Sequence, residues 1–260
     1  MRRFLALLPM LFLGTATFAA PGLKPGGVAE FNAELPRALR LVAGLGQLSP
    51  VEHALITIAS PANFEMAHDW PVMVISATSD PGYNSSRRLL AAYADTALKA
   101  GWILVAVDPM EAVAADNDNV SLRLALNTAA LAVLELQWPS AGKARLAFGG
   151  FSGGAKHTGW LAAAFASQGR NVAGIYLAGI DTDAVVPAAR HFNVLNADFK
   201  RVPIFLQYGD SDDIATPTEH WNVYDELKRA GFKNLRIENF RGAHAVHPGP
   251  LRKALDWFRE

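Results

Sequence analysis

The sequence predicts an α/β protein built on a mostly parallel sheet of about seven to eight strands, with helices on both faces. Two features of the chain point to this class. Short apolar stretches with the character of buried strands alternate with helical patterns along most of the sequence. In addition, residues 150–154 carry the pattern G-x-S-x-G where an apolar stretch meets a helical pattern, which suits a sharp turn from strand to helix.

The chain is expected to begin with a secretory signal peptide, residues 1–19. Arg2 and Arg3 supply a charged start, an apolar run covers residues 4–13, and small residues lead to a cleavage site after Ala19. The apolar run is too short to span a bilayer comfortably, so we expect cleavage and no stable membrane anchor. Residues 20–260 would then form a single secreted or periplasmic domain.

Composition excludes several kinds of site and partner. The sequence has no cysteine, which rules out disulfides, thiolate metal ligands and a cysteine nucleophile. Basic and acidic residues balance at 24 each, and removal of the signal peptide leaves a slight acidic excess. Such a charge gives no reason to expect nucleic acid or an anionic membrane as a partner. About half of the residues are hydrophobic, which is enough for one large core.

The first half of the domain is expected to start with an antiparallel arrangement and to continue with alternating strands and helices. Residues 20–27 are rich in proline and glycine and suggest a loose leader, whereas residues 30–48 show no clear pattern. We interpret residues 60–70 as a hairpin loop. The expected elements, in order, are strands at 53–59 and 71–76, a helix at 87–99 ended by Gly101, a strand at 102–109 and a helix at 121–137.

A polar cluster, Asp116-Asn117-Asp118-Asn119, precedes the helix expected at 121–137. A calcium-binding loop would need a glycine and a closing glutamate, which this cluster lacks. Aspartate and asparagine are also preferred residues for capping a helix N-terminus. We therefore predict that the cluster starts and caps the helix.

The second half predicts further parallel strands joined by helices. Residues 181–201 read as an irregular connection, too short for a helical cap domain, so an open cleft is expected. On such a sheet, reactive groups belong in the loops at the carboxyl ends of the strands. The expected elements are strands at 144–149, 172–178, 202–208 and 235–240, and helices at 154–167, 219–230 and 251–259.

The pattern at 150–154 predicts a nucleophilic serine. Ser152 would occupy the apex of the turn in a strained backbone conformation, with its hydroxyl clear of the sheet. Side chains two residues away on either side would collide there, which explains Gly150 and Gly154. The helix that follows would direct the N–H of Gly153 at the charge that develops on a substrate oxygen.

Two other loops at strand ends carry a candidate acid and a candidate base. The sequence Gly209-Asp210-Ser211-Asp212-Asp213 follows one strand, and Gly242-Ala243-His244 follows the next. With these motifs, nearly all of the mature chain resembles the α/β-hydrolase family. The resemblance implies that Asp212 orients His244 and that His244 takes the proton of Ser152. Because one extra residue separates Asp212 from Pro217, Asp213 and Asp210 remain rivals for the acid, and His247 is a rival for the base.

The resemblance also implies a second donor to the oxyanion in the loop after residue 75. Where the family often has His-Gly, this chain has Ser76-Ala77. The donor is a backbone N–H, so Ala77 and Thr78 are both candidates. The implied activity is that of a serine esterase acting on a small or polymeric carboxylic ester, without a cofactor or metal. A secreted peptidase or amidase with the same triad, and a non-catalytic binding protein, are the alternatives.

The remaining candidates are aromatic and histidine side chains. Three aromatic residues are candidates to line the cleft, although aromatic residues on helices are more often part of a core. A metal pair of His244 with His247 lacks a third ligand nearby. Five other histidines are interpreted as surface or locally hydrogen-bonded residues: His157, His220, His191, His53 and His68. An alternative position for His157 is at the border of the pocket. The three aromatic candidates are Tyr83, Trp160 and Phe151.

Overall fold

The computed structural model describes residues 22–42, 51–113 and 118–260. The expected signal peptide and residues 116 and 117 of the polar cluster lie outside this part. The described residues form one eight-stranded sheet with the order β1-β2-β4-β3-β5-β6-β7-β8. Its strands are β1 (Val28–Glu34), β2 (His53–Ala59), β3 (Val72–Ser76), β4 (Ile103–Pro109), β5 (Leu146–Phe151), β6 (Val172–Ala178), β7 (Ile204–Gly209) and β8 (Leu235–Phe240).

The sheet is antiparallel at its start and parallel from there on, as predicted. β2 pairs antiparallel with both β1 and β4, whereas β3 pairs parallel with β4 and β5. The interpretation of residues 60–70 as a hairpin loop is wrong, because β4 lies between β2 and β3. Phe64 and Trp70 of this connection are buried, and Phe64 packs against both Trp70 and Trp138, so the connection forms part of the core. The antiparallel partners of β2 are instead β4 and β1, and most of β1 lies in the stretch that showed no clear pattern.

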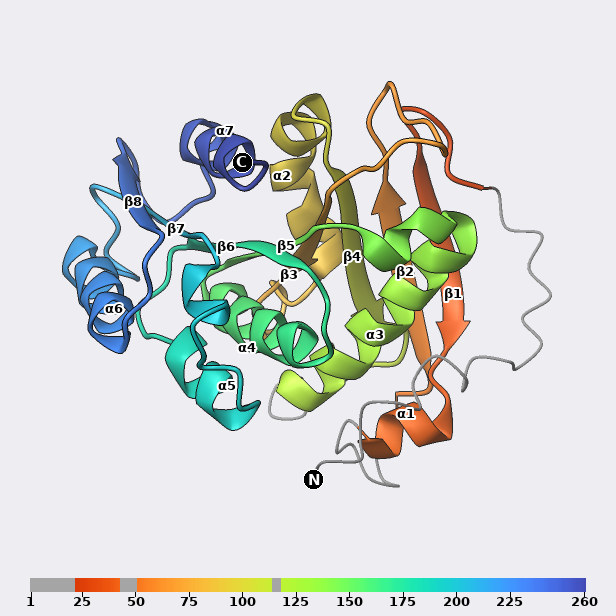
Figure 1. Cartoon of the computed structure of the whole chain (residues 1–260), viewed down its shortest axis with the longest axis horizontal. Helices are drawn as coiled ribbons and strands as arrows, with labels where there is room; N and C mark the ends of the chain where they lie inside the picture. The colour runs from red at the N-terminus through yellow and green to blue at the C-terminus, as the bar shows by residue number, and fades with distance from the viewer. Residues whose placement is uncertain (1–21, 43–50, 114–117) are drawn as a thin grey trace.

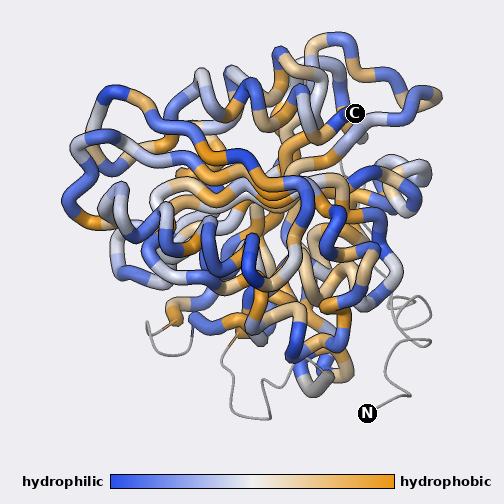
Figure 2. The backbone as a smooth tube through the Cα atoms, turned by 60° about the vertical axis from the view of Figure 1, so that its left-hand side comes forward, coloured by the Kyte–Doolittle hydropathy of each residue, from blue (hydrophilic) through white to orange (hydrophobic). Residues whose placement is uncertain are grey.

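Helices cover both faces of the sheet (Figure 1). Alternating strand residues separate the core into two layers, since side chains along a strand point to opposite faces. The helices are α1 (Arg37–Val42), α2 (Ser86–Lys99), α3 (Val120–Gln137), α4 (Gly153–Ser167), α5 (Val185–His191), α6 (Pro217–Ala230) and α7 (Pro248–Trp257). Val72 and Val74 belong to the core layer that includes buried residues of α3, α4, α5 and α6, and Met73 and Ile75 belong to the layer that includes those of α2 and α7. The central strands form a hydrophobic band in the interior (Figure 2).

Two local details refine the sequence-based interpretation. Asn119 caps α3 as predicted, because its side chain accepts a hydrogen bond from the Leu122 N–H. The connection between β6 and β7 was expected to be irregular, but it contains α5. This short helix begins after Asp183, whose carboxylate accepts hydrogen bonds from the N–H groups of Val185 and Val186.

Candidate active site

Ser152 occupies a strained turn between β5 and α4. Its φ of 57° and ψ of −127° place this non-glycine residue in a conformation that side chains disfavour. The flanking glycines are sterically required, as predicted. A Cβ on Gly150 would lie 2.1 Å from the carbonyl oxygen of Gly154, and a Cβ on Gly154 would lie 2.1 Å from that of Ser76. The sequence therefore folds here into a tight elbow with the serine at its apex.

Asp212 lies in the loop after β7 and is paired with His244. Its Oδ2 is 2.7 Å from Nδ1 of His244, and its Oδ1 accepts hydrogen bonds from the N–H groups of Ile214 and Ala215. The side chain is almost completely buried. Burial by itself would raise the pKa of the Asp212 carboxyl, but these hydrogen bonds favour the ionised form and lower the pKa below its usual value.

The two rival carboxylates have other surroundings. Asp210 accepts hydrogen bonds from the N–H of Gly242 and the hydroxyl of Ser211, so it braces the neighbouring loop. Asp213 is exposed at the surface. Of the three acidic residues, Asp212 is the one whose carboxylate contacts an imidazole.

His244 lies beside the elbow, in the loop after β8. Its ring centroid is 4.4 Å from that of Phe151, the residue before Ser152. A Cβ on Gly179 would come within 2.7 Å of its Cε1, so the end of β6 packs directly against the ring. Because a carboxylate accepts at Nδ1, the neutral tautomer that fits this contact carries its proton on Nδ1 and leaves Nε2 as an acceptor. Within the described chain, Nε2 is buried and has no hydrogen-bond partner.

No hydrogen bond joins Ser152 to His244, two residues that are both described. In unliganded enzymes such bonds are often long and tighten only when substrate binds. Nε2 is therefore an acceptor that remains available next to the elbow.

His247, the rival of His244, has a structural position instead. It caps the N-terminus of α7, where its side chain accepts a hydrogen bond from the Gly249 N–H. Its ring also stacks on Phe240, with centroids 4.8 Å apart. Among the described residues, no group of three or more histidine, aspartate or glutamate side chains could hold a metal ion.

The candidates for the second oxyanion donor differ in their contacts. The N–H of Ala77 donates a hydrogen bond to the Ser86 hydroxyl, at 3.3 Å. Thr78 lies against Gly153, since a Cβ on that glycine would be 3.5 Å from the Thr78 Cα and 2.5 Å from its hydroxyl. Of the two, Ala77 has its N–H engaged, whereas Thr78 lies in contact with Gly153 and is the stronger candidate.

A buried arginine that was not predicted from the sequence braces the loop that carries Thr78. Arg123 of α3 is fully buried and forms a bidentate ion pair with Asp118, with two contacts of 2.6 Å. Its other N–H groups reach the Ser86 hydroxyl and the Asn84 carbonyl oxygen. The feature of the sequence that could have indicated this role is an arginine in a mostly apolar helical segment.

His157 and His220 are buried rather than at the surface, and only His220 has a hydrogen bond that is local in the sequence. His157 Nδ1 lies 3.0 Å from the carbonyl oxygen of Ala77, so it supports the same loop as Arg123. His220 bonds the carbonyl oxygen of Thr216 through Nδ1 and accepts the N–H of Ile180 at Nε2. Burial lowers the pKa of both imidazoles, because it disfavours their charged forms.

The other predicted side chains are divided between the site and the rest of the surface. Phe151 contacts His244, as described above. Trp160 packs against His191 and Phe192 beside α5, and Tyr83 is 79 % exposed in the loop after β3. His53 pairs with Glu111, and His68 lies near Glu65, both at the surface.

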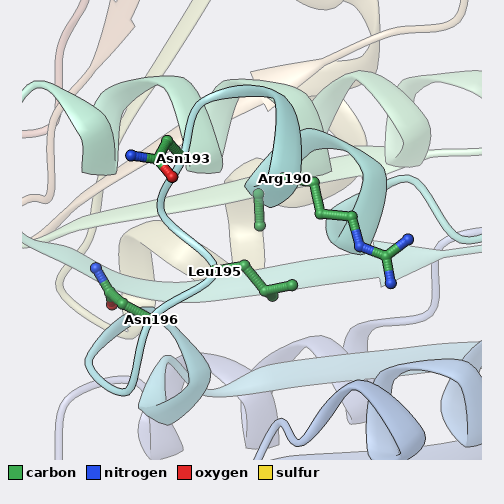
Figure 3. A pocket seen from close by; sticks show the side chains of 5 residues that line it. Arg190, Asn193, Leu195 and Asn196 are labelled. Carbon is green, nitrogen blue, oxygen red and sulfur yellow. The ribbon is translucent and has the colours of Figure 1, made fainter.

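A surface hollow of about 260 Å³ lies at the end of α5 (Figure 3). Ala189, Arg190, Asn193, Leu195 and Asn196 line it. It includes none of the candidate catalytic residues. The Asn196 carboxamide oxygen already accepts hydrogen bonds from the N–H groups of Asp198 and Phe199. The hollow therefore adds nothing to the chemistry of the elbow.

Comparisons with known proteins show similarity in structure and not in sequence. No protein-family model and no curated protein matches the chain in sequence. A lidless α/β serine hydrolase from Xanthomonas campestris aligns with 92 % of this chain and 96 % of its own, at a TM-score of 0.58 and 16 % identity. An esterase from Pyrococcus furiosus aligns with 79 % of this chain and 86 % of its own, at a TM-score of 0.53 and 15 % identity. An acylaminoacyl peptidase from Pyrococcus horikoshii aligns with 91 % of this chain but only 40 % of its own, at a TM-score of 0.55 and 15 % identity.

Proposed function

We propose that this chain, which has the α/β-hydrolase fold, is an extracytoplasmic serine hydrolase that cleaves carboxylic esters through an acyl-enzyme intermediate. One observation carries the proposal. The His244 imidazole, oriented by the Asp212 carboxylate, has an Nε2 without a hydrogen-bond partner and lies beside the strained turn that carries Ser152. Serine, imidazole and carboxylate in this relation form the constellation of serine hydrolases.

The proposed reaction has two steps, acylation of Ser152 and hydrolysis of the acyl-enzyme, and His244 transfers the proton in both. Ser152 Oγ attacks the carbonyl carbon of the ester while His244 Nε2 takes its proton. The N–H groups of Gly153 and Thr78 stabilise the negative charge on the carbonyl oxygen. When the intermediate collapses, the leaving alcohol receives the proton from His244, and the acyl group stays on Ser152. Water, activated by the same imidazole, then attacks the acyl group and releases the acid. The ionised Asp212 keeps the tautomer correct and stabilises the transient imidazolium.

An open site suits this reaction with small or polymeric esters. The connection between β6 and β7, which is fully described, holds α5 and a single 3₁₀ turn at Phe199–Arg201, and no cap domain. The likeness to an esterase from Pyrococcus furiosus supports an ester substrate, and the likeness to a lidless hydrolase from Xanthomonas campestris supports an open site. Export through the signal peptide at residues 1–19 is part of the proposal and places the reaction outside the cytoplasm.

Amide cleavage is the second candidate. It is favoured by the alignment of 91 % of this chain with part of an acylaminoacyl peptidase. The leaving amine of an amide must be protonated by His244 before it departs, which makes amides more demanding substrates for the same groups. A matched pair of an ester and its amide, with the same acyl group, separates the two activities.

The test is hydrolysis of a series of p-nitrophenyl esters, from acetate to long-chain acyl groups, by the protein without residues 1–19. We expect turnover, labelling of Ser152 by a fluorophosphonate, and a loss of about a millionfold in kcat in Ser152→Ala. Ser167→Ala, on the last turn of the same helix, is the matched control and should retain activity. Absence of both turnover and labelling in the folded protein would refute the hydrolase assignment and favour a binding protein.

A further inference from the structure

We propose that Gln207, a buried residue of β7, is a positioning residue that fixes the loop carrying His244. The proposal rests on the function proposed above, because it concerns the base of that reaction. Gln207 has no exposed surface and is a polar residue among the apolar side chains of β7. A buried amide without partners would be costly, so its partners indicate what it holds in place.

Gln207 binds the backbone directly after His244. Its Nε2 donates a hydrogen bond of 2.8 Å to the carbonyl oxygen of Ala245. Its Oε1 accepts a hydrogen bond of 2.9 Å from the N–H of His247. One side chain thus satisfies two backbone groups that lie within three residues of His244, and fixes the path of the chain between them.

The two backbone partners fix the orientation of this amide. The Ala245 carbonyl oxygen can only accept and the His247 N–H can only donate, so rotation of the amide by half a turn would place oxygen against oxygen and N–H against N–H. A third hydrogen bond, from the Tyr176 hydroxyl of β6, also reaches Oε1, at 2.5 Å. Gln207 is therefore locked in the one orientation that suits Ala245 and His247.

The backbone before His244 is fixed by the same strand and its loop. The Gly242 N–H donates to the Asp210 carboxylate, and the Gly242 carbonyl oxygen accepts the N–H of Ser211, each at 2.9 Å. Residues 241–245 belong to neither a helix nor a strand, so these contacts replace the hydrogen bonds of regular structure. β7 and its loop consequently hold His244 from three sides: before it, after it, and through Asp212 at the ring.

This arrangement matters because Nε2 of His244 must meet the Ser152 hydroxyl. A displacement of about 1 Å in a catalytic group can cost roughly a hundredfold in rate. Loss of the contacts to Ala245 and His247 would free the backbone after His244, whereas the backbone before His244 would stay held by the loop after β7. The result would be a misplaced base in a folded protein that still binds substrate.

The experiment compares Gln207→Leu, Gln207→Glu and Tyr176→Phe with the wild type. Gln207→Leu removes both loop contacts, and we expect kcat to fall about 10- to 100-fold with little change in KM. Tyr176→Phe is the matched control, since it removes the third hydrogen bond but leaves both contacts to the loop. It should retain kcat within about threefold even where its Tm falls as far as that of Gln207→Leu.

Gln207→Glu keeps the size of the side chain and provides a readout that a purely structural role would not change. When protonated, the introduced carboxyl can donate to Ala245 as the amide does, and when ionised it cannot. Burial raises the pKa of such a carboxyl. The kcat of this variant relative to wild type should therefore be close to one at low pH and fall as pH rises. A ratio that does not change with pH would contradict the proposal.

The proton between His244 Nδ1 and Asp212 gives a readout that does not require catalysis. We expect its strongly deshielded NMR resonance to shift or broaden in Gln207→Leu and to remain unchanged in Tyr176→Phe. An unchanged resonance together with a kcat within twofold of wild type in Gln207→Leu would overturn the proposal. If the wild type proves inactive on esters, the hydrolase assignment fails, but the resonance still tests the role of Gln207.

Discussion

Nδ1 of His244 lies 2.7 Å from Oδ2 of Asp212, although 32 residues separate the two side chains in the sequence. The contact forms because β7 and β8 are parallel neighbours, so the loops that follow them meet at one edge of the sheet. Close backbone packing brings the loops together, since a Cβ on Gly209 would lie 2.3 Å from the carbonyl oxygen of Gly242. This pair, more than any other contact, supports the proposed hydrolase chemistry.

The first prediction distinguishes Asp212 from its two rivals. Asp212→Asn should lower kcat by about 10⁴-fold, because an amide in that position stabilises the wrong tautomer of His244 and not its charged form. Asp213→Asn should have little effect, since Asp213 is exposed. Asp210→Asn should cost less than Asp212→Asn, because Asp210 contacts the loop and not the imidazole. Steady-state kinetics on one ester checks all three, and full activity in Asp212→Asn would refute the assignment.

The second prediction concerns the oxyanion donors, which are backbone groups. Replacement of Thr78 by its α-hydroxy analogue converts the N–H into an ester oxygen and leaves the side chain intact. We expect kcat to fall about a hundred- to a thousandfold, the usual cost of one lost donor. The same replacement at Ala77, whose N–H donates to Ser86, is the matched control and should cost less than about tenfold. Equal losses at both positions would contradict the choice of Thr78.

The order of elements and the position of the serine could be predicted from the sequence because they depend on local rules. Period-two and buried-strand patterns identified most strands. The need for Gly150 follows from a steric contact within five residues, with Gly154, whereas Gly154 is also required by its contact with the more distant Ser76. β1 could not be recognised, because it is an edge strand in which Phe31 is the one buried residue. The pairing of β2 with β4 rather than β3 also has no local signal, since strand order is a property of the whole sheet.

The supporting residues of the site were harder to predict for a related reason. Arg123 and Gln207 act through partners that are far away in the sequence, at Asn84 and Ala245. In the sequence each is only a polar residue within an apolar segment. Asp212 could be selected only through resemblance to a known motif, because its distinction from Asp210 and Asp213 depends on the position of His244.

The third prediction concerns the buried ion pair of Arg123 and Asp118. Arg123→Met leaves the Asp118 carboxylate buried without its partner, which should lower the free energy of unfolding by about 3–5 kcal/mol. Arg252→Met is the matched control, because Arg252 pairs with Asp256 at the surface of α7, where such pairs contribute about 0–1 kcal/mol. Urea unfolding followed by circular dichroism measures both. Similar values for the two variants would show that the buried pair contributes no more than a surface pair.

The fourth prediction is a loss of stability in mildly acid solution caused by His157 and His220. Burial lowers the pKa of each in the folded protein below the value of about 6.5 expected in the unfolded chain. As pH falls through that range, the unfolded chain binds protons first, so the free energy of unfolding decreases. His220 contributes directly, because protonation would place an N–H at Nε2 against the N–H of Ile180.

The measurement is Tm between pH 8 and pH 5. His220→Gln should be less stable than wild type at pH 8 but lose less stability on acidification, because a glutamine side chain does not titrate. His68→Gln, at an exposed position, is the matched control and should follow the wild-type curve. A wild-type Tm that rises from pH 7 to pH 5, or a His220→Gln curve parallel to wild type, would show that the buried imidazole does not govern this transition.

The Asp212 carboxyl, with its lowered pKa, adds a separate loss of stability only below about pH 4. A carboxyl that is stabilised in its ionised form loses that contribution to stability as it is protonated.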